Sequence, residues 1–215
     1  MLQVYLVRHG ETLWNAERRI QGQSDSPLTA LGEQQAMQVA QRVKALGITH
    51  VIASDLGRTQ RTAQIIAEVC GCTMVLDARL RELDMGVLER RYLDSLTDEE
   101  EGWRRRLVNG TPDGRIPDGE SMQEVSVRMH GALNACRELP EGSRPLLVSH
   151  GMALGCLVST ILGLPPYAER RLRLRNCSLS RVDYQQSPWL APGWVVEMAG
   201  DISHLNAPAL DELQR

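Results

Sequence analysis

Three short apolar segments, each followed by polar residues and then by a helical pattern, constrain the fold of this chain most strongly. The segments are Leu2–Val7, His50–Ser54 and Pro145–Ser149. They lack strict alternation of apolar and polar residues, which is typical of parallel strands covered on both faces. Apolar stripes with helical spacing predict helices over Ala30–Leu46, over Thr59–Val69, after the capping residue Ser121 and over Met152–Leu162. This alternation of strands and helices predicts an α/β fold with a mostly parallel central sheet.

Two parts of the chain break this pattern. The stretch 87–119 is rich in charge, glycine and proline, and we expect it to form an excursion over the sheet. Cys177–Tyr184 and Gly193–Met198, separated by prolines, are expected to form a late pair of strands. The length of 215 residues fits a single domain, 1–215, into which the excursion is inserted.

Composition and charge exclude several classes of protein. With 42% hydrophobic residues the chain should be globular, and its formal net charge of −3 gives no reason to expect nucleic acid or a membrane surface as partner. No stretch approaches the length of a membrane-spanning helix. The five cysteines are odd in number and scattered, which favours reduced thiols and a cytoplasmic location. Monomer and homodimer both stay open.

Arginine and histidine residues stand directly after the predicted strands. Arg8-His9-Gly10 follows the first strand and Ser149-His150-Gly151 the third, while Arg58 opens the helix after the second. Ligands of open α/β sheets bind at the carboxyl ends of the strands, and a helix N-terminus with an arginine favours an anion. Alone, each histidine is more often a hydrogen-bonded structural residue, and Arg58 a surface cation. Their repetition at strand ends instead predicts one pocket for a small anionic ligand.

These residues belong to a longer set of motifs that resembles a known family. The set comprises Arg8-His9-Gly10-Glu11-Thr12-Leu13-Trp14-Asn15, Gln21-Gly22, Asp25-Ser26-Pro27-Leu28-Thr29, Ser54–Ala63, Leu80-Arg81-Glu82-Leu83 and Val148-Ser149-His150-Gly151. In this order, over residues 2–163, it is similar to the histidine phosphatase superfamily, and in particular to its cofactor-dependent phosphoglycerate mutase branch. The resemblance implies a three-layer sandwich with helices on both faces of the sheet. It also implies an enzyme that transfers phosphoryl groups through a phosphohistidine intermediate.

The resemblance assigns a role to each motif residue by matched position. His9 would attack phosphorus, and Glu82 would protonate the leaving oxygen and then deprotonate water. The phosphoryl group and the rest of the substrate would be held by Arg8, Asn15, Gln21, Gly22, Arg58, Glu82, His150 and Gly151. Elementary electrostatics supports this allocation, because Arg8, Arg58 and a protonated His150 could neutralise the phosphoryl oxygens without a metal or another cofactor. The same cations would lower the pKa of His9 and keep it neutral and nucleophilic.

Three functions fit these motifs. They are hydrolysis of phosphorylated small metabolites, a phosphoglycerate mutase reaction with 2,3-bisphosphoglycerate as cofactor, and phosphate binding without catalysis. The mutases usually carry Glu-Arg-His-Tyr-Gly at the acid/base, whereas this chain has Glu82-Leu83-Asp84-Met85-Gly86. Arg104 and Arg105 resemble the mutases' paired substrate-binding arginines, although a solvated helix face is an equal alternative. We expect hydrolysis to predominate, also because Leu210–Arg215 offers little to close over the pocket.

The remaining histidines and a late group of arginines are expected to lie outside the site. His50, His130 and His204 show no metal-ligand spacing, so no metal site is predicted. The arginines of the late group are expected to be surface or packing cations, and they are Arg170, Arg171, Arg173 and Arg175.

Overall fold

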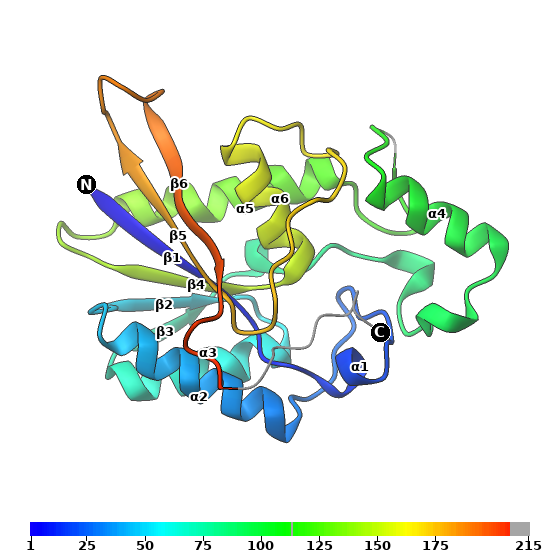
Figure 1. Ribbon diagram of the computed structural model, residues 1–215, viewed down its shortest axis with the longest axis horizontal. Coiled ribbons are helices and arrows are strands. Elements are labelled where there is room, and N and C mark those ends of the chain that lie inside the picture. Colours follow the sequence, from blue (N-terminus) through cyan, green and yellow to red (C-terminus); the bar gives the residue numbers. More distant parts are fainter. Residues whose placement is uncertain (113, 207–215) are drawn as a thin grey trace.

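One six-stranded sheet organises the chain in the computed structural model, which describes residues 1–112 and 114–206 (Figure 1). Its strands, in spatial order, are β3 (Thr73–Leu76), β2 (His50–Ala53), β4 (Pro145–Ser149), β1 (Leu2–Arg8), β5 (Leu179–Gln185) and β6 (Gly193–Asp201). β3, β2, β4 and β1 pair in parallel, whereas β5 and β6 run antiparallel to their neighbours. The predicted mostly parallel sheet and its late pair of strands are thus confirmed.

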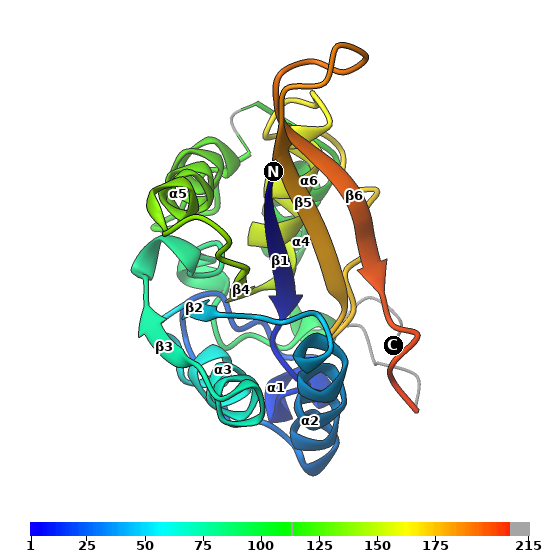
Figure 2. The same cartoon turned by 90° about the vertical axis from the view of Figure 1, so that its left-hand side faces the viewer.

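Helices cover both faces of this sheet, as the alternating pattern predicts (Figure 2). The covering helices are α2 (Ala30–Lys44) and α3 (Gly57–Cys70) on one face, and α5 (Met122–Ala135) and α6 (Gly151–Ile161) on the other. Along β1, Val4 and Leu6 pack with α5 and α6, while Tyr5 and Val7 pack with α2 and α3. Successive side chains of a strand point to opposite faces, so all four are buried and each face has its own apolar core. The molecule is therefore a three-layer sandwich.

The starts of two covering helices have local chemical causes. At α2, the hydroxyl of Thr29 accepts a hydrogen bond from the Gly32 N–H at 3.0 Å. At α5, Ser121 and Glu124 form a capping box in which each side chain accepts from the other residue's backbone N–H, at 3.3 Å and 2.8 Å. These bonds satisfy N–H groups that the first helical turn leaves without an intrahelical acceptor, and they fix where each helix begins.

The excursion over residues 87–119 holds more regular structure than its composition suggests. Its elements are η2 (Gly86–Leu88), η3 (Leu93–Ser95) and the α-helix α4 (Asp98–Val108). α4 lies beyond the carboxyl ends of the strands (Figure 1), and its Trp103 and Leu107 pack against the core on the α5 and α6 side. A capping box of Thr97 and Glu100 opens the helix. The capping box can be recognised in the sequence, but the charged residues around Trp103 and Leu107 obscure the narrow apolar stripe of this helix.

A few short elements have no clear signal in the sequence. They are α1 (Leu13–Ala16), β3, and the single turns η1 (Ala78–Leu80) and η4 (Cys136–Glu138). β3 is an edge strand with mostly exposed side chains, so it lacks the apolar run that marks the buried strands. Within the described ranges no helix is long and apolar enough to span a membrane. All five cysteines fall in these ranges and are free thiols.

Candidate active site

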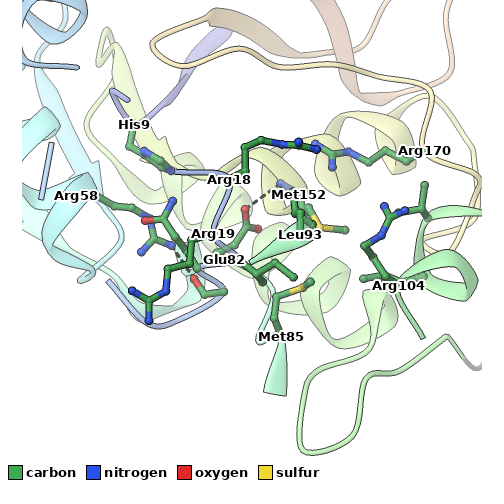
Figure 3. A pocket seen from close by; sticks show the side chains of 15 residues that line it. His9, Arg18, Arg19, Arg58, Glu82, Met85, Leu93, Arg104, Met152 and Arg170 are labelled. Carbon is green, nitrogen blue, oxygen red and sulfur yellow. Dashed lines mark hydrogen bonds between the residues drawn. The ribbon is translucent and has the colours of Figure 1, made fainter. Parts of the chain in front are cut away.

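The strand-end motifs meet at one edge of the sheet. β1 leads into His9, β4 leads into His150, and Arg58 is the second residue of α3. β4 pairs with both β1 and β2, so the three ends lie side by side. The pocket beside them is lined by His9, Arg18, Arg19, Ile20, Gln21, Gly22, Arg58, Glu82, Met85, Leu93, Arg104, Leu107, Val108, Met152 and Arg170 (Figure 3). Folding thus brings His9, Arg58 and Glu82 into one cavity.

His9 is held as a neutral imidazole with one defined tautomer. Its ring is 2% exposed, and Nδ1 lies 2.8 Å from the carbonyl oxygen of Gly10. Because a carbonyl only accepts, Nδ1 carries the proton and Nε2 keeps its lone pair. Burial lowers the pKa of His9 well below 6.5, and the nearby charges of Arg58 and Arg8 lower it further. This agrees with the neutral histidine that the sequence predicts, and the role of His9 as nucleophile stays a prediction.

His150 is also neutral, which differs from the protonated residue expected from the sequence. Its Nδ1 accepts a hydrogen bond from the Arg58 Nε–H at 3.2 Å, so its proton sits on Nε2, which donates to the Ser54 hydroxyl at 2.9 Å. Burial, followed by the charge of Arg58, lowers the pKa of His150 well below 6.5. The expectation that a protonated His150 adds a third cation beside Arg8 and Arg58 is therefore wrong for the site without a ligand. The ring orients Arg58 instead.

Arg58 is 1% exposed and is fixed by the loop that precedes α2. Its guanidinium donates to the carbonyl of Gly22 at 2.7 Å, to that of Ser24 at 2.8 Å and to the carboxylate of Asp25 at 2.8 Å. Together with His150, these acceptors hold a planar cation against the pocket wall. A rigid, partly neutralised guanidinium of this kind is suited to binding phosphoryl oxygens.

Arg8 and the glycines after the two histidines, Gly10 and Gly151, are predicted or neighbouring site residues that are not among those lining the pocket. Arg8 is 2% exposed and donates to the carbonyl of Leu174 at 2.8 Å. A Cβ atom on Gly151 would lie 3.3 Å from the guanidinium carbon of Arg8, and one on Gly10 would lie 2.5 Å from the carbonyl oxygen of Gly32. Glycine is therefore required at position 10, where a Cβ atom would collide with backbone, whereas a Cβ atom at position 151 would press on the Arg8 side chain.

Glu82 lies at the N-terminus of α6. One carboxylate oxygen accepts from the backbone N–H groups of Leu83 and Ala153, both at 2.9 Å, and the other accepts from that of Met152 at 3.1 Å. The first N–H groups of a helix are free to bind an anion, which explains why the carboxylate docks there. Glu82 thereby faces the same cavity as His9 and Arg58 (Figure 3).

The predicted substrate-binding residues divide into those inside the pocket and those outside it. Gln21 and Gly22 line the pocket, whereas Asn15 is 4% exposed and is not among the lining residues. Asn15 instead completes the cap of α1, where its side-chain oxygen accepts from the Thr12 N–H at 3.1 Å. The structure therefore places Asn15 in support of the loop that carries the lining residues.

The two candidate arginines of α4 also separate. Arg104 lines the pocket and pairs with Glu101 through two hydrogen bonds of 2.6 Å and 2.7 Å. Arg105 has a side chain that is 69% exposed, pairs with the same carboxylate and does not line the pocket. Neighbours along a helix point in different directions, so one helix presents the pocket residue and the solvated residue side by side.

Three pocket-lining arginines were not predicted to belong to the site. They are Arg18, Arg19 and Arg170. The expectation that Arg170 is a surface or packing cation is therefore wrong, because it lines the pocket. The segment after α6 returns to α4, where the Arg170 N–H donates to the carbonyl of Val108 at 3.0 Å. Arg18 adopts a left-handed backbone with φ of 57°, which no local motif indicates. Only the adjacent Arg18-Arg19 pair in the sequence hints at a cationic site.

The motifs and their arrangement define a class of protein. Residues 4–197 match the family described as histidine phosphatase superfamily (branch 1). The chain belongs to this superfamily and is one of its enzymes.

The relatives carry names from two reactions. The chain is 86% identical to the probable phosphoglycerate mutase GpmB of Cronobacter sakazakii, over 100% of both chains. Among solved structures it is similar to Bacillus stearothermophilus YhfR, with a TM-score of 0.86 and 29% identity over 95% of this chain and 99% of that one. It is also similar to a phosphoserine phosphatase from Entamoeba histolytica, with a TM-score of 0.81 and 26% identity over 95% and 100% of the two chains.

Proposed function

We propose that this enzyme hydrolyses phosphomonoesters of small metabolites through a phosphohistidine formed at His9, without a metal ion. The observation that carries the proposal is the state of His9. Its Nδ1 proton is tied to the carbonyl of Gly10, its Nε2 lone pair is unprotonated, and the ring shares a pocket with Arg58 and Glu82. A neutral imidazole held in one tautomer beside guanidinium groups is ready to act as a nucleophile towards phosphorus.

Two steps complete the reaction. Glu82 takes up a proton from solvent as the anionic substrate binds. Nε2 of His9 then attacks phosphorus, the bond from phosphorus to the ester oxygen breaks, and Glu82 gives that proton to the departing alkoxide. A water molecule then attacks the phosphohistidine while Glu82 takes one of its protons. The bond from phosphorus to Nε2 breaks, inorganic phosphate leaves, and both side chains return to their starting states.

The positive charge for these steps comes from arginine side chains. Arg58 and Arg8 stand next to His9, close enough for their charges to lower its pKa. Among the described residues no group of three or more histidine, cysteine, aspartate or glutamate side chains could hold a metal ion. His150 contributes through its bond to Arg58, and a direct contact with a phosphoryl oxygen would require it to exchange one of its two present partners.

A mutase reaction is the main alternative, because of the name of the relative from Cronobacter sakazakii and the position of Arg104 in the pocket. It would need 2,3-bisphosphoglycerate as cofactor and a pocket that keeps water away until a second hydroxyl accepts the phosphoryl group. Leu83, which replaces an arginine of the mutases, is fully buried in the apolar core and offers nothing to an anionic substrate. Leu210–Arg215, which entered the sequence argument for hydrolysis, lies outside the described residues.

The first test traps the intermediate. Mixing the enzyme with a ³²P-labelled phosphomonoester and quenching within the first turnover should yield a protein label that is stable in base and labile in acid. His9→Ala should give no label and no phosphate release while retaining the far-ultraviolet circular dichroism of the parent. Equal labelling of the His9→Ala protein would remove His9 from the role of nucleophile, and non-catalytic phosphate binding would be the better account if the parent bound phosphate without being labelled.

The second test separates hydrolysis from isomerisation. A coupled assay follows 2-phosphoglycerate formed from 3-phosphoglycerate, with and without 2,3-bisphosphoglycerate, beside the release of inorganic phosphate. We expect phosphate release to be the faster process under both conditions. Formation of 2-phosphoglycerate that depends on the bisphosphate and outpaces phosphate release would establish the mutase alternative.

A further inference from the structure

The pocket extends beyond the phosphoryl-transfer residues to an end that is lined by arginines. His9 and Arg58 lie at one end of the cavity, and Arg18 and Arg170 reach towards each other from opposite walls farther along it (Figure 3). Arg18 comes from the loop after α1, and Arg170 comes from the segment after α6. The proposed hydrolysis does not use either side chain.

These two guanidinium groups are poorly compensated by the protein. Arg18 pairs with Asp94, whose side chain is 67% exposed, and its Nε–H group is buried without a hydrogen-bond acceptor. In the part of the chain that the structure describes, the guanidinium of Arg170 has neither an ion pair nor a hydrogen bond. Like charges that face each other across a cavity repel, and an anion bound between them removes that repulsion. The electrostatics therefore points to a second anion-binding position.

The backbone at Arg18 is held in a costly conformation that directs the side chain to this position. Its φ of 57° lies in the left-handed region, which arginine rarely adopts. Two hydrogen bonds keep it there, because the Arg18 N–H donates to Asn15 at 3.2 Å and the Leu93 N–H donates to the carbonyl of Arg18 at 3.0 Å. Strain of this kind persists where surrounding contacts enforce it, and it is concentrated at ligand-binding sites.

Much of the pocket wall is apolar, although Arg19, Gln21 and Arg104 also line it. The apolar residues are Ile20, Met85, Leu93, Leu107, Val108 and Met152. Such side chains cannot satisfy the hydroxyl groups of a sugar-like body, whereas they favour an alkyl or aryl body. Figure 3 shows Met152, Leu93 and Met85 between Glu82 and Arg104, so this part of the pocket offers a ligand mainly apolar contacts.

We propose that the substrates are phosphomonoesters with an apolar body and a second anionic group, which binds between Arg18 and Arg170. The inference rests on the proposed phosphatase function and specifies its substrate class. A carboxylate and a second phosphate share the required chemistry, since the guanidinium fork matches both.

The test uses alkyl phosphates of graded length that end in a carboxylate, in the uncharged carboxamide of the same shape, or in a second phosphate. For the parent enzyme at the matching length, kcat/KM for the carboxylate should exceed that for the carboxamide by about tenfold to a hundredfold. Arg170→Gln should abolish most of this preference, because it should lower kcat/KM for the carboxylate far more than for the carboxamide. Arg171→Gln is the matched control, because the neighbouring side chain is 80% exposed and pairs with Glu169; it should keep the preference.

A second variant guards against misfolding. Arg18→Asn keeps a residue that tolerates the left-handed backbone, so it should fold and should also lower the preference. The ranking of the carboxylate against the second phosphate identifies which anion the position takes. The inference is overturned if the parent hydrolyses carboxylate and carboxamide equally at every length, or if the preference survives both substitutions. These outcomes differ from those expected if the proposed phosphatase function itself is wrong. In that case no phosphate would be released from any ester, and no phosphoenzyme would form.

Discussion

At the scale of single residues, Arg58 shows how burial separates a site residue from an ordinary surface cation. Arg58 and Arg61 lie one turn apart on α3, yet the first is 1% exposed beside His9 and His150 and the second pairs with Glu33 in solvent. A contact that strengthens in the transition state is worth roughly 2–4 kcal/mol, so Arg58→Ala should lower kcat/KM by about 30- to 1000-fold. Steady-state release of phosphate from a phosphomonoester measures the effect.

Arg61→Ala serves as the control from the same helix. Exposed ion pairs contribute about 0–1 kcal/mol to stability and nothing to a distant reaction, so its kinetics should match those of the parent. If the two variants lost activity to the same extent, Arg58 would have no special place in the reaction and the loss would reflect damage to α3.

At the scale of elements, one arginine of α5 fixes the segment that carries Glu82. The guanidinium of Arg128 donates to the carbonyls of Arg79, Arg81 and Glu82, the last at 3.0 Å, and pairs with Glu120 at 2.7 Å. Arg128 is thus a positioning residue, because it sets where the Glu82 carboxylate meets the N-terminus of α6. We expect Arg128→Gln to lower kcat by about tenfold, or ~1.4 kcal/mol in activation free energy, with little change in KM.

The matched control is Arg115→Gln, since Arg115 pairs with exposed Glu124 and donates to the carbonyl of Gly119. Its kcat should stay within twofold or so of the parent value. Arg128→Lys, which keeps the charge but loses the planar fork, should recover only part of the rate. A fall in stability with unchanged kcat in Arg128→Gln would limit this residue to a structural role.

At the scale of the whole molecule, the two buried histidines make stability depend on pH. The pKa values of His9 and His150 lie well below 6.5 in the fold because of burial and the charge of Arg58. In the unfolded chain both return to about 6.5, so the unfolded state binds more protons just below that pH. Their contribution to the unfolding free energy is complete above pH 6.5 and is lost as the pH falls below it. The slope is at most about 1.4 kcal/mol per pH unit for each histidine.

Urea unfolding from about pH 7 to about pH 5.5 measures this dependence. His9→Asn should remove the share of one histidine from the slope. His130 and His204 also have pKa values lowered by burial, but they are present in both proteins and cancel in the difference. Identical slopes for parent and variant would mean that His9 is not held neutral by the fold.

The sequence by itself determined the layered fold and the main residues of the site. Apolar runs without alternation gave β1, β2 and β4 within one residue at each end, because a strand buried on both faces must be apolar throughout. The expected placement of His9 and Arg58 at one pocket also holds, since the carboxyl ends of parallel strands share one edge of the sheet. Glu82, which only the family resemblance placed in the site, lines the same pocket. Both results depend on patterns that are local in the chain.

Only the tertiary structure decided the charge states and the far end of the pocket. His150 is neutral because burial, followed by the charge of Arg58, lowers its pKa. Arg58 is distant in sequence and donates to the ring, and no neighbouring residue in the chain indicates that contact. Arg18 and Arg170 face one cavity because a strained turn and a returning segment place them there. Whether an arginine faces a ligand or the solvent depends on contacts between segments far apart in the chain, as Arg104 and Arg105 show on one helix.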